Sequence, residues 1–117
     1  MSKFDKLNRR VGTWAKSKGI LDKATPLTQH SKTQEEVNEL FEALFSQQNN
    51  LENYTTYKGD VKNTKEEIKD AIGDILVTLL IQCKLQNLTT VECLESALNI
   101  IEKRTGKMIN GTFVKNN

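Results

Sequence analysis

The feature that most constrains the fold is a run of apolar residues at positions 75–85, which begins inside the stretch "EEIKDAIGDILVTLLIQC" at 66–83. The pattern Thr64-Lys65-Glu66-Glu67 upstream is typical of a capping box, so we expect a helix that begins there, with Thr64 as its N-cap. From residue 75 onward this helix is apolar on nearly all sides, and its most apolar part, residues 75–81, is too short to span a bilayer. Such a helix must be buried by more than one neighbour.

Three further helices are predicted from periodicity and end signals. The first covers residues 3–18 and stops at Gly19, and a short connector, "ILDKA", follows it. The second begins with Thr25 as N-cap and Pro26 at its first position, and it fades at "SQQNN". Its apolar stripe consists of Val37, Leu40, Phe41, Leu44 and Phe45. The last helix starts at a second capping box, "TTVE", and ends near residues 105–106.

Length and composition fit one all-α domain. The 117 residues include a single proline and six glycines, and they contain no alternating β-branched runs. Only 37% of the residues are hydrophobic, which is lean for a domain of this size. We therefore predict a four-helix bundle over residues 1–117, with 105–117 as a C-terminal tail and a core completed by a second copy of the chain.

Charge and cysteine usage narrow the location and the partners. A net charge of +2 with interspersed signs argues against nucleic-acid binding driven by bulk charge. Cys83 and Cys93 lie in apolar helical settings without a C-x-x-C pattern, so we expect reduced, buried thiols and a cytoplasmic protein. The opening "MSKFDKLNRR" lacks the apolar region of a secretory signal, and no segment predicts a membrane partner.

A polar, turn-rich segment at residues 47–63 separates the two central helices. Tyr54, Tyr57 and Lys58 within it could contact a ligand, although the composition favours a solvated connector.

Carboxylates gather on both central helices. Glu36 and Glu39 lie roughly 60° apart on the helical wheel, on the side away from the apolar stripe, where acidic residues usually face water. Glu67, Asp70 and Asp74 form a second stripe, at i, i+3 and i+7, which continues into the apolar run. Buried carboxylates on adjacent turns repel each other, and a hard cation such as Mg²⁺ or Mn²⁺ would relieve that repulsion. A di-iron site would use Glu-x-x-His motifs, and the chain's only histidine, His30, has no glutamate three residues before it.

Four segments in order resemble one family. "QHSKTQEEVNEL" at 29–40 resembles the E-E-x-x-E motif of the MazG-like, all-α nucleoside triphosphate pyrophosphohydrolases, and residues 67–80 resemble their E-x-x-D segment. "TWAKSKGI" and "EKRTGKMINGTFVK" resemble the entry and ending of short members, many of them from phages. The resemblance implies an all-α dimeric fold and Mg²⁺-dependent hydrolysis of a nucleoside triphosphate to the monophosphate and pyrophosphate.

The second motif departs from the family, since Ala71 stands where many members carry a glutamate three residues before the aspartate. Two assignments remain open. Glu67 and Asp70 form a literal E-x-x-D, or else Asp74 is the family aspartate and Asp70 replaces the glutamate. We prefer the second, because "GDIL" matches the family's register and Glu67 has a competing role in the cap with Thr64. The metal candidates are therefore Glu36, Glu39, Asp70 and Asp74, and Glu67 is a secondary candidate.

Other residues are candidates for catalysis and substrate binding. Glu35 is the candidate proton acceptor, although its alternative as a surface acid is equally compatible with the sequence. Trp14 could stack on a base or lie in the core. The candidates for binding phosphates are Lys32, Arg104, Lys107 and Lys115, and the resemblance alone adds Gln29 and Asn110 as readers of a base edge. The rival classes are a non-catalytic helical dimer that binds nucleotides or regulates, and a small nucleic-acid-binding protein that uses its basic ends.

Overall fold

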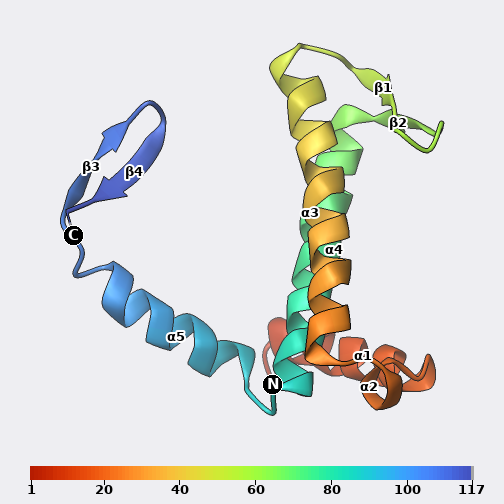
Figure 1. Cartoon of the computed structure of the whole chain (residues 1–117). Helices are drawn as coiled ribbons and strands as arrows, with labels where there is room; N and C mark the ends of the chain where they lie inside the picture. The colour runs from red at the N-terminus through yellow and green to blue at the C-terminus, as the bar shows by residue number, and fades with distance from the viewer. Residues whose placement is uncertain (117) are drawn as a thin grey trace. The chain divides into compact units, whose positions relative to one another are not determined.

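The computed structural model describes residues 1–116, which divide into two compact units that meet at Asn87 and Leu88. In the first unit the elements are α1 (Lys3–Ser17), α2 (Ile20–Lys23), α3 (Pro26–Gln48), β1 (Asn53–Thr55), β2 (Val61–Asn63) and α4 (Thr64–Leu85) (Figure 1). The second unit contains α5 (Thr90–Ile101), β3 (Gly106–Ile109) and β4 (Thr112–Lys115). The predicted helical class is confirmed, but the architecture is not a plain four-helix bundle.

Several helix ends lie where local chemistry predicts them. Thr25 caps α3, with Pro26 at its first position, and Thr89 forms a capping box with Glu92 at the start of α5. Gly19 follows α1 with a φ of 77°, a left-handed conformation that suits glycine. The connector after Gly19 forms the single helical turn α2.

Two antiparallel hairpins replace segments that we expected to be irregular. Residues 47–63 are not only a connector, because β1 pairs with β2 from Asn53↔Asn63 to Thr55↔Val61. The expected tail pairs β3 with β4 around Asn110 and Gly111, both of which have positive φ. An Asn-Gly pair of this kind is the characteristic two-residue turn of a hairpin.

The core of the first unit lies between α3 and α4, which run antiparallel. Ala43 on α3 and Ala71 on α4 are fully buried, so the two backbones approach closely. Hydrogen bonds hold both ends of the seam: the Gln29 side-chain amide donates to the Thr78 carbonyl at 3.1 Å, and the Ser46 and Thr64 hydroxyls lie 2.8 Å apart. Because the seam uses small and polar residues, it aligns α3 with α4 and positions the carboxylates on both helices.

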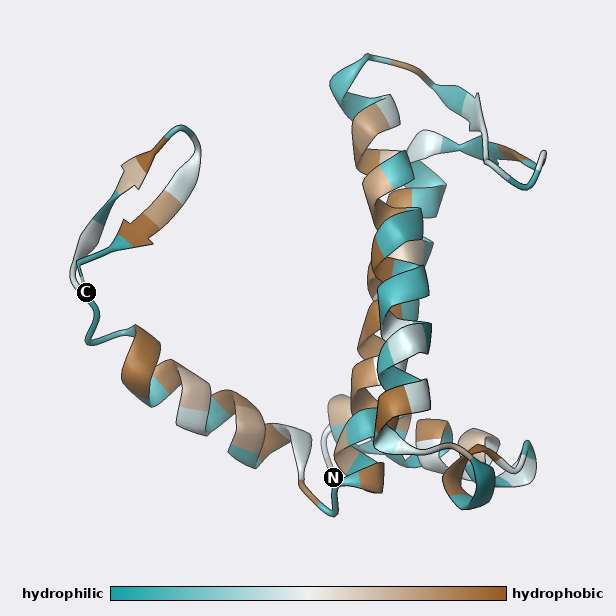
Figure 2. Cartoon of the chain, viewed as in Figure 1, coloured by the Kyte–Doolittle hydropathy of each residue, from teal (hydrophilic) through white to brown (hydrophobic). Residues whose placement is uncertain are grey.

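The faces that bury apolar residues differ from the prediction. On α3 the apolar stripe is largely exposed, with Val37, Phe41, Leu44 and Phe45 at 40–67% exposure, while the acidic side of the helix packs on α4. On α4 the side chains of Leu76 and Leu79 are about half exposed, so one chain alone does not give the burial on all sides that we expected for residues 75–85. Figure 2 shows hydrophobic residues along much of α4. Among the described residues no large side chain is fully buried. The small residues at the α3–α4 seam, rather than the apolar stripes, therefore set the pairing of these helices within one chain.

Two further features are the environment of the cysteines and the apolar length of the helices. Cys83 is half-buried, but Cys93 is exposed rather than buried within the second unit. Within residues 1–116 no helix combines the length and apolar composition that crossing a bilayer requires.

Candidate metal and nucleotide site

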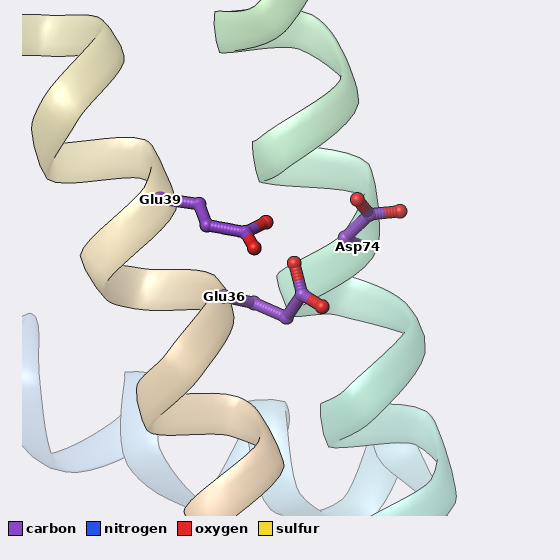
Figure 3. A group of neighbouring side chains, drawn as sticks. All are labelled: Glu36, Glu39 and Asp74. Carbon is purple, nitrogen blue, oxygen red and sulfur yellow. The ribbon is translucent and has the colours of Figure 1, made fainter. Parts of the chain in front are cut away.

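Three carboxylates from two helices meet beside the α3–α4 seam. Glu36 and Glu39 extend from α3 toward α4, where Asp74 lies on the facing helix (Figure 3). One oxygen from each residue can be chosen so that the three lie within 4.8 Å of one another. The i, i+3 spacing on α3 places both glutamates on one face, and the antiparallel pairing adds Asp74. The group Glu36, Glu39 and Asp74 is called the acidic triad below.

Glu36 is the buried member of the acidic triad. The residue is only 8% exposed, and its Oε2 atom is buried without a hydrogen-bond partner. Lys32 Nζ lies 3.6 Å from the other oxygen, Oε1. Burial, followed by the neighbouring Glu39 and Asp74 carboxyls, raises the pKa of Glu36 to about 7. A buried carboxylate oxygen without a donor is costly. The Glu36 carboxyl also lies beside two further carboxyls, where a hard cation would find oxygen ligands.

Asp74 shows the same electrostatic conflict in a more exposed position. Burial and then the charges of Asp70 and Glu39 raise the pKa of Asp74. Lys32 opposes this increase, and Lys58 Nζ lies 3.9 Å from Glu39 Oε1. Both ammonium groups are also shared with Glu35, so they do not balance three further carboxylates. The acidic triad therefore carries excess negative charge that a divalent cation would neutralise.

The structure does not bring Glu67 or Asp70 into the acidic triad. Asp70 is exposed and acts on Asp74 through its charge. Glu67 lies 4.0 Å from Lys62 on β2, and burial raises the pKa of Glu67 although Lys62 lowers it.

The expected cap role of Glu67 is wrong. Asn63 caps α4, because its side chain accepts from the Glu66 backbone N–H at 3.1 Å. The Thr64 hydroxyl instead donates, at 2.7 Å, to the carbonyl of Leu51, which lies in the loop after α3. Glu67 therefore has no competing duty at the helix start.

Ala71 marks where the chain departs from the family motif, and its surroundings explain the residue. Its side chain is fully buried in the core beside α3. A glutamate at this position would have to displace the close packing of α3 against α4, and α4 therefore supplies a single carboxylate, Asp74, to the triad.

Glu35, the candidate proton acceptor, lies outside the acidic triad. Its two oxygens are 3.3 Å from Lys32 Nζ and 3.8 Å from Lys58 Nζ. Both carboxylate oxygens of Glu35 are therefore engaged in ion pairs.

A cavity of about 210 Å³ adjoins one side of the triad. Trp14, Gln29 and Lys32 line it together with Glu36 and Asp74. The Trp14 side chain is half exposed rather than a core residue, so an aromatic face remains accessible beside the carboxylates. Gln29 is buried, and its amide nitrogen is engaged with the Thr78 carbonyl, which favours a role in holding the helices over reading a base edge.

The remaining candidates belong to the second unit. Lys107 and Lys115 lie on β3 and β4, Arg104 precedes β3, and Asn110 forms the turn with Gly111. All are exposed within that unit. The positive φ of Asn110 gives this residue a backbone role that the sequence analysis did not anticipate.

A second cleft near the acidic triad was missed from the sequence. It has a volume of about 190 Å³, and it is lined by residues of the β1–β2 hairpin together with Glu39, Glu42 and Glu67. The hairpin residues include Tyr54, Tyr57, Lys58 and Lys62. Its signal in the sequence was the cluster of tyrosines and lysines in residues 54–62. We had considered ligand contacts by Tyr54, Tyr57 and Lys58 but favoured a solvated connector.

The raised pKa of Glu36 predicts how stability depends on pH without metal. The folded protein binds the Glu36 proton more tightly than the unfolded chain, whose pKa is near 4.5. The protonated Glu36 therefore contributes to the free energy of unfolding below pH 4.5. This contribution, at most about 3 kcal/mol, is lost as the pH rises through about 7. Thermal melts in a chelator should show Glu36→Gln gaining more over wild type at pH 8 than at pH 5. An equal gain at both pH values would contradict the electrostatic account, and Glu66→Gln on α4 is the control.

Comparisons of the chain with protein-family models, with curated proteins and with solved structures found no match.

Proposed function

We propose that this chain is a Mg²⁺-dependent nucleoside triphosphate pyrophosphohydrolase of the MazG-like kind. Its substrates would be deoxynucleoside or non-canonical nucleoside triphosphates, and its products the monophosphate and pyrophosphate. The observation that carries the proposal is the buried Glu36, which has a partnerless Oε2 atom and whose carboxyl lies beside those of Glu39 and Asp74. The order of four family-like segments along the chain supports the same reading.

Each part of the site has a role in this reaction. Glu36, Glu39 and Asp74 would hold Mg²⁺ or Mn²⁺, both of which prefer oxygen ligands. A bound divalent cation supplies charge neutralisation at the phosphates and lowers the pKa of bound water. Lys32, at the edge of the cavity, places an ammonium near the phosphates, and the exposed indole of Trp14 offers a stacking face for the base. The proposal leaves the proton acceptor unassigned, because Glu35 is held by two lysines.

A panel of nucleotides tests the proposal. Purified protein would be incubated with canonical and modified nucleoside triphosphates and Mg²⁺, and pyrophosphate and monophosphate would be measured. Equimolar release of both products supports the proposal, whereas release of orthophosphate contradicts it. Nucleotide binding without turnover would favour the non-catalytic module. This alternative remains open because Ala71 leaves α4 with a single carboxylate in the triad. Salt-sensitive binding to DNA or RNA with no turnover would favour the nucleic-acid-binding class.

The proposal includes a homo-oligomer, at least a dimer, in the cytoplasm. The exposed stripe on α3 and the half-exposed side chains on α4 form apolar surfaces that a second copy would cover. Within residues 1–116 no large side chain is fully buried, which supports completion of the core by a partner chain.

Light scattering at micromolar concentration is expected to give a dimer or tetramer mass. Phe41→Glu, in the middle of the α3 stripe, should shift the mass toward the monomer, because a charge in an apolar interface is unfavourable. Val61→Glu, at an exposed position on β2, is the matched control and should leave the mass unchanged. A monomer mass for the wild-type protein would contradict the proposal.

A further inference from the structure

The β1–β2 hairpin holds a lysine beside the acidic triad. Its turn is closed by two hydrogen bonds, from the Thr56 N–H to the Asp60 carbonyl at 2.8 Å and from the Gly59 N–H to the Thr56 carbonyl at 2.9 Å. Gly59 has a φ of 92°, which a residue with a side chain rarely adopts. This closed turn fixes the position of Lys58, the residue before the glycine.

Lys58 reaches across to α3. Its Nζ atom lies 3.8 Å from Glu35 Oε1 and 3.9 Å from Glu39 Oε1, and 5.5 Å from the centre of the Tyr57 ring. About half of the Lys58 side chain remains exposed. Ion pairs of this length and exposure are weak and easily exchanged. One of the two partners, Glu39, belongs to the acidic triad, so Lys58 supplies positive charge where a divalent cation would bind.

The cleft beneath the hairpin contains donors suited to phosphate oxygens. Besides Lys58 it is lined by Lys62, by the threonine Thr56 and by two tyrosines, Tyr54 and Tyr57. Ammonium and hydroxyl groups are hydrogen-bond donors, and phosphate oxygens are strong acceptors. The acidic residues that also line this cleft would repel a triphosphate unless cations offset their charge.

We propose that the β1–β2 hairpin is the phosphate-binding wall of the site, and that Lys58 exchanges its carboxylate partners for phosphate oxygens when a divalent cation enters the acidic triad. This inference rests on the proposed function, because it assigns the side of the site that receives the triphosphate. A cation bound to Glu39 repels the nearby ammonium, so the weak Lys58 ion pairs are lost first. Lys58 is then placed to pair with the triphosphate, and Glu35 keeps only its contact with Lys32.

The proposal predicts opposite effects on two ligands. In Lys58→Met the competing charge is lost while the aliphatic stem is retained, so Mg²⁺ alone should bind about threefold more tightly. Inorganic tripolyphosphate, measured at fixed free Mg²⁺, should bind about tenfold more weakly because a charge-assisted contact is lost. Lys58→Arg should stay near wild type for both ligands. Lys69→Met, an exposed cation on α4 that does not line the cleft, should change neither.

Calorimetry on the chain of residues 1–117 measures both affinities. Opposed shifts in Lys58→Met with unchanged Lys69→Met would support the proposal, while shifts in the same direction, or none, would overturn it. Wild-type protein that bound neither Mg²⁺ nor tripolyphosphate would overturn it too. The assay of pyrophosphate release separates this inference from the proposed function: turnover with an unaltered Lys58→Met profile refutes only the role of the hairpin. Opposed binding shifts without turnover refute only the hydrolase.

Discussion

Replacing Glu36 by glutamine is expected to abolish Mg²⁺-dependent pyrophosphate release, with a loss of at least about 100-fold, because residues that only support metal ligands already cost 10–100-fold. The amide keeps the shape of the side chain and removes the negative charge that holds a hard cation. Glu39→Gln should have an effect of similar size, since Glu36 and Glu39 each contribute a carboxylate oxygen to the acidic triad. Assays of initial rates at saturating Mg²⁺, paired with circular dichroism, would establish that activity falls while helix content is unchanged.

The control for these variants is Glu66→Gln. Glu66 is an exposed acid in the first turn of α4 and lies outside the triad, so its charge is removed without affecting the proposed ligands. Its activity should stay within about twofold of wild type, as is usual for surface substitutions of this kind. Wild-type activity in both Glu36→Gln and Glu39→Gln would mean that the site has been placed wrongly.

The helix ends were predictable where a few neighbouring residues determine them. Thr25 with Pro26, Gly19, and Thr89 with Glu92 all act as the sequence indicates. At α4 the same reasoning placed the cap one residue late. Asn63 and Thr64 are both competent N-caps, and the choice was decided by a long-range contact, in which Thr64 bonds to Leu51 and Ser46.

The two hairpins have turn signals in the sequence that could have predicted them. Asn110-Gly111 between apolar residues is a strong hairpin signal, but the helical composition of the chain led us to treat the segment as a tail. The β1–β2 hairpin has weaker signals, because its turn runs from Thr56 to Asp60 and contains one glycine at a positive φ.

The faces of α3 could not be assigned from periodicity. An amphipathic stripe indicates which residues are buried, but it does not indicate whether the same chain or another chain covers them. In this chain Ala43 and Ala71 let α3 and α4 meet on the acidic side, which leaves Val37 and Phe41 exposed. The same pairing brings Asp74 to Glu36 and Glu39, a contact that spacing along one helix cannot predict.

The ordering of two α4 variants tests the register that the sequence left open. Asp74→Asn should reduce turnover by at least about 100-fold, because Asp74 is the carboxylate that α4 contributes to the triad. Glu67→Gln should reduce turnover by less than about fivefold, in keeping with a weak ion pair to Lys62 and no part in the helix cap.

Stability without metal gives an independent check on the same pair. Asp74→Asn removes like-charge repulsion from Asp70 one turn earlier, which is worth about 0.2–0.5 kcal/mol on a helix, and it also lowers the charge facing Glu36. Its melting temperature in a chelator should therefore rise, whereas Glu67→Gln loses an ion pair as well as a repulsion and should change little. A larger loss of turnover in Glu67→Gln than in Asp74→Asn would overturn the assignment. The literal E-x-x-D of Glu67 and Asp70 would then be the metal-binding pair, and α4 would have to rotate relative to α3 to bring those side chains to Glu36.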